Sequence, residues 1–348
     1  MPAQIKTCPE DFIVDEIPAY EPTGDGAHLY VTFTKRDLTT DFVVSAIARG
    51  VKARLRDIGV PGMKDKVAIT SQTISIPWVE GLDAAVLALE IPGVTITSAK
   101  RHNNKLKTGH LHGNRFRVRI SSIDQAEGDR IVSALERIKL EGVPNAFGAQ
   151  RFGRSGDNAV RAKAWLEGKE APPRDPRQLR FLFSALQSAV FNEVLARRVQ
   201  EGTWATVVEG DLVKRRDSGG LFLCTDEQQD RERAARGEVS ATGPIPGVKM
   251  RPAEGAPGVI EREVFQQIVG DAVDFAKTAR LGEGTRRVLR LWVEELTVSR
   301  EQDDSIWVYF VLPKGAYATT VIAAACDSSV EQGERDDGDP TPTEEPNR

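Results

Sequence analysis

The segment VPGMKDKVAITSQTISI, residues 60–76, joins a polar glycine turn to a run rich in β-branched side chains. Because Val, Ile and Thr favour extended backbone, residues 67–76 are predicted to form a strand. The turn carries Asp65 between Lys64 and Lys66, and nearby cations favour the ionised carboxylate that a nucleophile or general base requires. An ordinary polar turn is the competing interpretation, and for this motif alone it is the more common one. In extended backbone both lysine side chains point away from Asp65.

Towards the N-terminus, the sequence alternates between predicted strands and a predicted helix. Residues 11–34 contain two β-rich runs separated by a polar stretch with glycine, which predicts strand, loop and strand. Residues 41–55 (DFVVSAIARGVKARL) repeat apolar side chains at three- and four-residue spacing, which is typical of an amphipathic helix. Thr40 or Asp41 is expected to cap the start of this helix, and Gly59 is expected to end it.

Towards the C-terminus, the pattern of helices and strands continues. Predicted helices cover 83–91, 125–141, 179–200 and 317–326, and predicted strands cover 112–121, 290–300 and 305–313. Between 202 and 260, glycine, proline and charged residues interrupt every pattern, and GPIPG at 243–247 predicts a loop. The sequence therefore indicates an α/β (α+β) protein without internal repeats.

The composition is that of a globular protein, because 40% of the 348 residues are hydrophobic and 28% are charged. No run approaches the roughly 20 apolar residues that a membrane helix requires. The first residues lack the charged-then-apolar pattern of a signal peptide. The three cysteines are far apart and form no paired motif, which favours a reducing compartment. A cytoplasmic location is therefore expected.

The net charge of −4 is distributed unevenly. Residues 328–348 contain seven acidic residues and two arginines, a local charge of −5, which leaves residues 1–327 at +1. This acidic tail has almost no apolar side chains and is predicted to be disordered. A nearly neutral body with local basic patches is compatible with binding to RNA.

The strongest basic patch is Lys100–Arg119 (KRHNNKLKTGHLHGNRFRVR), which holds seven Lys/Arg residues and no acid. Such a density of cations, including Lys105, Lys107 and Arg115, can neutralise phosphates. The two-residue period of a strand places Arg115 and Phe116 on opposite faces. A solvated basic face beside an ordinary core strand is the alternative. Although three of the four histidines lie in this run, no cysteine or carboxylate lies nearby, and no metal site is predicted.

Two further loops could contribute to a site. Residues 144–153 (PNAFGAQRFG) combine glycines that permit tight turns with Arg151 and Phe152, a cation and a ring. Residues 313–320 (PKGAYATT) place Tyr317 after a glycine turn, between a predicted strand and a predicted helix. A ring that fills the core is the commoner explanation for Tyr317, and glycine loops with an arginine are common.

The order of these strings is more specific than any one of them. GMKDKVAITSQ, HGNRF, VPNAFGAQRFG, FSALQSAVFN and LPKGAYATTV, in that order, resemble the tRNA pseudouridine synthase D family over residues 4–327. The resemblance implies a pseudouridine synthase catalytic domain with a mixed, mostly antiparallel sheet, built from 1–141 and 286–327. It also implies an inserted, family-specific α+β domain at 142–285, while 328–348 remains the disordered tail.

The resemblance also implies a set of site residues. Asp65, in GMKDK, matches the catalytic aspartate, and Lys6 and Phe12 match a lysine and a phenylalanine that line the active site. Asn114 and Phe116, in GNRF, match the Asn-x-Phe pair, and their two-residue spacing places them on one side of a strand. The last motif has Tyr317 where many bacterial members have phenylalanine, which keeps a ring and adds a hydroxyl.

The implied activity is the isomerisation of a uridine in tRNA, uridine 13 in this family, without cofactor or metal. The cations Lys105, Lys107, Arg115 and Arg151 are expected to contact the RNA backbone. Two other functions compete with this one. A non-catalytic RNA-binding protein on the same scaffold would not require Asp65, and a metal-dependent nuclease would require clustered carboxylates that the basic segments do not supply.

Overall fold

The computed structural model describes residues 3–153, 155–270, 273, 275–301, 303–326 and 331–332. The chain forms two compact units, each built from separate stretches of sequence. Unit 1 contains the residues up to Glu136, Glu294–Gly315 and those from Ala325, and unit 2 contains Arg137–Val293 and Ala316–Ala324. The predicted catalytic and inserted domains, with limits at 141 and 286, stay predictions.

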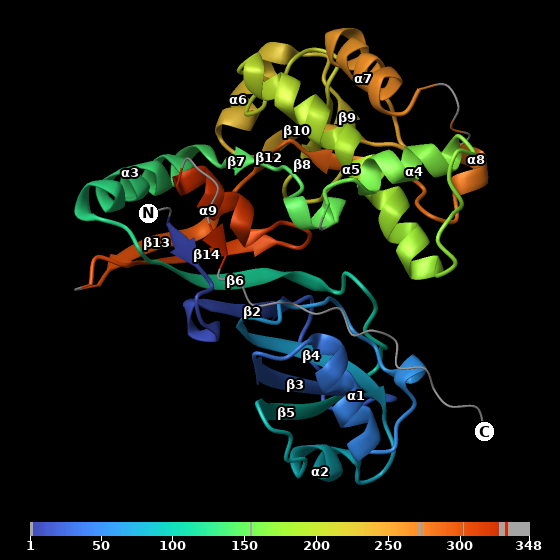
Figure 1. The fold of residues 1–348 in the computed structure, drawn as a ribbon, viewed down its shortest axis with the longest axis vertical. Coiled ribbons are helices and arrows are strands. Elements are labelled where there is room, and N and C mark those ends of the chain that lie inside the picture. The colour runs from blue at the N-terminus through green and yellow to red at the C-terminus, as the bar shows by residue number, and fades with distance from the viewer. Residues whose placement is uncertain are drawn as a thin grey trace. The chain divides into compact units, whose positions relative to one another are not determined.

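In the part of unit 1 that the structure describes, seven strands form one sheet in the order β13-β14-β6-β2-β4-β3-β5 (Figure 1). Strands β2 and β4 run parallel, and the other neighbouring pairs in this sheet are antiparallel. The mixed, mostly antiparallel sheet is thereby confirmed. The strand bounds are β2 Phe12–Pro18, β3 His28–Arg36, β4 Ile69–Pro77, β5 Val94–His102, β6 Leu111–Ile120, β13 Glu294–Arg300 and β14 Ile306–Pro313.

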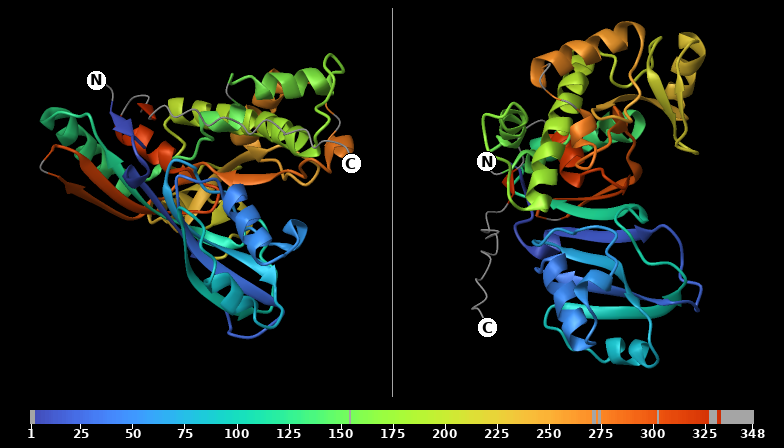
Figure 2. Two further views of the ribbon diagram at one scale, coloured as in Figure 1. Left: turned by 60° about the horizontal axis from the view of Figure 1, so that its bottom comes forward. Right: turned by 90° about the vertical axis from the view of Figure 1, so that its right-hand side faces the viewer.

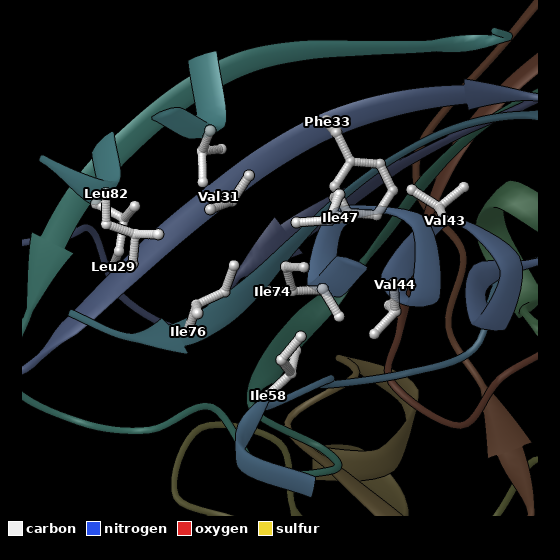
Figure 3. Close-up of a cluster of buried hydrophobic side chains, with 12 residues drawn as sticks. Leu29, Val31, Phe33, Val43, Val44, Ile47, Ile58, Ile74, Ile76 and Leu82 are labelled. Carbon is white, nitrogen blue, oxygen red and sulfur yellow. The ribbon is translucent and has the colours of Figure 1, made fainter. Parts of the chain in front are cut away.

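A hydrophobic core joins one part of this sheet to helices α1 (Thr40–Gly50) and α2 (Leu82–Leu87). Leu29, Val31 and Phe33 of β3 alternate along one face of the strand and are fully buried in a cluster with residues of α1 and α2, where Phe33 lies beside Ile47 and Leu29 beside Leu82 (Figure 3). In both views of Figure 2, α1 lies against the sheet. Every second side chain of β3 therefore points to the buried face of the sheet.

Helix α1 differs at both ends from the sequence prediction. Its N-cap is Thr39, whose hydroxyl accepts a hydrogen bond from Phe42 N at 3.2 Å, instead of Thr40 or Asp41. The helix ends at Gly50 because Lys52 adopts a left-handed conformation with φ of 55°. The predicted continuation to Gly59 was wrong, and a 3-10 turn, η2 (Leu55–Asp57), follows instead.

Removal of the observed cap gives a small and specific effect. Thr39→Ala is expected to lower the free energy of unfolding by about 1 kcal/mol, because Phe42 N loses its acceptor at the first turn. Thr39→Ser keeps the oxygen and is expected to change stability by only a few tenths of a kcal/mol, about the difference between good N-caps. Urea denaturation of the two variants measures the difference. Equal stabilities would mean that the hydroxyl of Thr39 does not cap the helix.

Unit 2 contains a four-stranded sheet in the order β11-β10-β8-β9, among its described residues. Its strands are β8 Leu212–Arg215, β9 Leu221–Leu223, β10 Val239–Ile245 and β11 Thr285–Val288. The long helix α5 (Pro176–Gln200) packs on this sheet through Phe191 and Leu195. On another side, α5 packs against α4 (Asn158–Leu166) and α7 (Gly255–Ile268) through Val190 and Val194.

The region 202–260 is more regular than its composition predicts. It contains β8, β9, α6 (Glu227–Ala235) and β10, which runs through Gly243 and Pro244 where a loop was expected. Strand β10 pairs with β8 over Val239–Ala241 but with β11 alone over Thr242–Ile245. Pro244 therefore lies in a part of β10 that pairs with a strand on one side only. The N–H group that proline lacks is not needed on the unpaired side.

The remaining described elements complete the fold. They are β1 Gln4–Ile5, η1 Pro9–Asp11, α3 Gln125–Glu141, β7 Val143–Pro144, η3 Ala149–Phe152, α8 Phe275–Thr278, β12 Arg290–Leu291, α9 Ala318–Cys326 and β15 Glu331–Gln332. Strand β15 pairs in parallel with β1. The rest of the predicted disordered tail, 328–348, lies outside the described residues. Every helix that the structure describes is too short or too polar to span a membrane.

Candidate active site

The loop that carries Asp65 is held at both ends. Before it, Gly59 and Ser75 exchange two backbone hydrogen bonds of 2.8 and 2.9 Å. After it, Asp37 N donates to Ala68 O at 3.2 Å, just before β4 begins. A Cβ atom at Gly59 would lie 2.2 Å from Leu106 O, so only glycine fits this approach. The loop is thus anchored at both ends and leads into β4, an inner strand of the sheet.

The cation that contacts Asp65 comes from a distant part of the chain. Lys6 Nζ lies 2.8 Å from Asp65 Oδ1, and it donates a hydrogen bond to that oxygen. The Lys6 side chain is 7% exposed, whereas that of Asp65 is 39% exposed. The carboxylate therefore has one side fixed by a buried ammonium and another open to solvent.

Lys6 itself has an unusual backbone, with φ of 57°. A left-handed conformation is uncommon for lysine and persists only where the surroundings impose it. Here Gln4, two residues before Lys6, exchanges two backbone hydrogen bonds of 3.0 Å with Ser121. This geometry directs Nζ of Lys6 over the ring of Phe12, 4.0 Å from its centroid.

Aromatic rings continue from this point. Phe12 and Phe116 meet edge to face with centroids 6.1 Å apart, and Phe116 stacks on Phe310 at 5.4 Å. Lys6, Phe12 and Phe116 are thus joined by successive contacts. Because Phe116 is only 6% exposed, its ring lies mainly among other side chains, and its contact with a nucleotide stays a prediction.

The ammonium of Lys64 contacts side chains of β2 and β6. It lies 3.0 Å from Glu16 Oε2 and donates to Asn114 Oδ1 at 2.5 Å. Glu16 and Asn114 are opposite each other on β2 and β6, so one cation contacts both strands. Burial raises the pKa of Glu16 despite the nearby charge of Lys64. This buried pair holds the turn on the sheet and fixes the amide of Asn114.

A second buried cation, Lys35, contacts the backbone of the same turn. Its side chain is fully buried, and its ammonium donates to Asp65 O and to Leu38 O, both at 2.6 Å. Burial lowers the pKa of Lys35 from 10.5 to about 8, and the charge of Asp65 only partly compensates. The pattern HLYVTFTKR contained the signal, because Lys35 continues the buried series of Leu29, Val31 and Phe33.

The lowered pKa of Lys35 predicts a pH dependence of stability. Folding opposes protonation of this amine, so its destabilising effect is complete below pH 8 and is relieved as the pH rises towards 10.5. Between pH 7 and 9.5, the stability of the wild type relative to Lys35→Met is expected to rise by about 1–2 kcal/mol. Urea unfolding of both proteins measures this difference, and a constant value would contradict a buried ammonium.

In unit 2, the predicted residue Arg151 lies in a cluster of arginine and aromatic side chains. Arg287 donates to Asn145 Oδ1 at 2.5 Å and lies over the ring of Phe147, 4.2 Å from its centroid. Arg151 lies over the same ring and donates to Ser184 Oγ at 3.3 Å. Burial lowers the pKa of Arg287 to about 10, and the nearby cation of Arg151 lowers it as well. Arg151 therefore belongs to this cluster, Tyr317 belongs to the same unit, and the relation of both residues to Asp65 stays a prediction.

The remaining predicted RNA contacts lie in unit 1. Lys107 is exposed, Lys105 Nζ donates to Arg56 O at 3.1 Å, and Arg115 lies 3.4 Å from Glu295 at an exposed position. Arg115 and Phe116 occupy opposite faces of β6, as predicted. Among the described residues, no group of three or more His, Cys, Asp or Glu side chains could hold a metal ion.

The fold is that of the pseudouridine synthases. It is similar to a crystal structure from Methanosarcina mazei described as a tRNA pseudouridine synthase D, with a TM-score of 0.74 over 94% of each chain. The two sequences are 24% identical, so this similarity supports the fold alone.

The sequence comparisons are closer and define the family. The model described as tRNA pseudouridine synthase D (TruD) matches residues 1–169 and 164–324. The tRNA pseudouridine synthase D of Anaeromyxobacter dehalogenans (strain 2CP-C) is 38% identical over 337 residues, which cover 95% of each chain. A tRNA pseudouridine synthase D of Thermus thermophilus is 41% identical over 92% of this chain and 87% of the relative. The chain belongs to the tRNA pseudouridine synthase D family, a family of isomerases.

Proposed function

We propose that this chain isomerises a uridine of tRNA to pseudouridine and that Asp65 supplies the catalytic carboxylate. The observation that carries the proposal is the ion pair of Asp65 with the nearly buried ammonium of Lys6, 2.8 Å away. The buried partner fixes one oxygen of the carboxylate, and its exposed side leaves room for a nucleotide to approach. An oriented and accessible carboxylate is what the reaction requires.

The chemistry needs no imported atom and no net change in oxidation state. The N1–C1′ bond of uridine breaks, C5 bonds to C1′, the C5 proton passes to solvent, and N1 carries a proton in the product. A carboxylate can attack C1′ or remove the proton from C2′, and Asp65 is compatible with both routes. Because the base must leave its stack, we propose that Phe12, Phe116, Asn114 and Tyr317 hold it during rotation.

The substrate is the finer part of the proposal. Membership of the family supports tRNA, and we propose uridine 13 as the modified position, as the resemblance implies. Lys105, Lys107, Arg115 and Arg151 are proposed contacts to the RNA backbone. Such contacts make affinity fall with salt, roughly in proportion to the number of phosphates neutralised. The cytoplasmic location stays a prediction.

A tritium-release assay separates the candidate functions. The protein is incubated with tRNA labelled with tritium at uracil C5, with and without a metal chelator. Isomerisation releases tritium to water and leaves the strand intact in both conditions. A shortened strand would indicate a nuclease, and stoichiometric binding without release would indicate the non-catalytic RNA-binding alternative. Either result would contradict the proposed function.

A further inference from the structure

Three polar side chains lie inside the hydrophobic core of unit 1 and all reach the turn that carries Asp65. Lys35 and Thr40 are 0% exposed, and Gln72 is 1% exposed. They come from three different elements, β3, α1 and β4. Buried polar groups are costly unless they are hydrogen-bonded, so a cluster of them needs a structural reason.

The hydrogen bonds of this cluster end on the backbone of the turn. Thr40 Oγ1 accepts from Lys64 N at 3.0 Å and donates to Gln72 Oε1 at 2.9 Å. Gln72 Nε2 donates to Gly62 O at 3.4 Å. Lys35 Nζ donates to Asp65 O at 2.6 Å. Residues 62, 64 and 65 are thus held by side chains that are inaccessible to solvent.

We infer that Lys35, Thr40 and Gln72 are positioning residues for Asp65: together they fix the backbone of the turn so that its carboxylate meets Lys6 and faces the substrate. This inference rests on the proposed function of Asp65. None of the three side chains is exposed, so they act through the turn and do not contact the nucleotide. A displacement of about 1 Å at a reacting group is enough to slow a reaction by about 10²-fold.

The test uses the full-length protein and an isosteric pair of variants. Thr40→Val removes the hydroxyl that links Lys64 N to Gln72, while Thr40→Ser retains it. Thr70→Val is the matched control, because Thr70 is also 0% exposed and its hydroxyl has no hydrogen-bond partner among the described residues. The readouts are the single-turnover rate constant of tritium release at saturating enzyme, the Kd for tRNA, and the urea midpoint.

Thr40→Val is expected to lower the rate constant by about 10- to 100-fold with the Kd for tRNA unchanged within about twofold. Thr40→Ser and Thr70→Val are expected to retain the wild-type rate within about threefold, since the hydrogen bonds to the turn persist in both. A partly unfolded preparation would only lower the concentration of active enzyme, so it would shift the urea midpoint and leave the rate constant at saturating enzyme unchanged. That result for Thr40→Val would overturn the inference, as would a loss of tRNA binding equal to the loss of rate.

Lys35→Met is an independent variant for the same inference. It keeps the length of the side chain, removes the donor to Asp65 O, and is expected to slow the reaction by about 10- to 100-fold at unchanged Kd. Wild-type rates in Lys35→Met and Thr40→Val would overturn the positioning role. Asp65→Asn serves as the reference. If Asp65→Asn is inactive while Thr40→Val and Lys35→Met keep the wild-type rate, the positioning inference has failed and the proposed function stands. If Asp65→Asn is itself active, the proposed function has failed.

Discussion

Asp65→Asn is expected to lower the single-turnover rate of tritium release by at least about 10³-fold, because the amide can neither attack C1′ nor accept the C2′ proton. The substitution preserves the size of the side chain and can still accept a hydrogen bond from Lys6. The Kd for tRNA is therefore expected to change by less than about threefold, as for a residue used mainly in the transition state. Rates and filter-binding affinities measured on the same preparations separate the two effects.

Asp15→Asn is the control for this substitution. Asp15 is an exposed residue of β2, in the same sheet, and its variant tests the removal of one negative charge near the basic strand β6. We expect it to retain the wild-type rate within about twofold, as is usual for surface substitutions. If Asp65→Asn lost tRNA binding together with activity, Asp65 would have a structural role instead of a catalytic one.

Lys6→Met is expected to produce the second largest effect, a loss of about 10²-fold in the single-turnover rate. The methionine stem can still lie against Phe12, but the donor to Asp65 Oδ1 is lost. Without that donor the carboxylate is free to adopt other rotamers, so fewer molecules hold it in the reactive orientation. Single-turnover kinetics at saturating enzyme give the rate constant directly.

Lys52→Met controls for the backbone of Lys6. Lys52 is also a lysine with positive φ, 55° against 57° for Lys6, but it is exposed in the segment after α1. The same substitution in the same conformation is therefore expected to leave the rate unchanged within about twofold. An equal loss of rate in both variants would assign the effect to the strained backbone and not to the ion pair.

Much of unit 1 could be predicted from the sequence because its signals are local. The alternation along β6 predicted the opposite faces of Arg115 and Phe116, and the turn before β4 was found from its glycine and β-branched residues. The same alternation, applied to β3 and β4, would have identified Lys35 and Gln72 as polar residues on a buried face.

Other features could not be read locally. Lys6 contacts Asp65 across 59 residues of sequence, and only the sheet brings the two side chains together. The family resemblance named both residues, but nothing in KTCPEDF alone indicates that its lysine is a buried partner of a carboxylate. Strand β10 shows the opposite case, because Gly243 and Pro244 are strong local signals for a loop. These residues are nevertheless part of a strand, since this part of β10 pairs with β11 on one side only and tolerates a proline there.

The most direct test of the role of Asp65 is made in cells that lack the gene. Pseudouridine in their total tRNA is mapped position by position after complementation with either the wild-type protein or Asp65→Asn at equal expression. We expect the wild type to restore pseudouridine at position 13 and Asp65→Asn to restore none. Restoration of pseudouridine by both proteins, or by neither, would contradict this expectation.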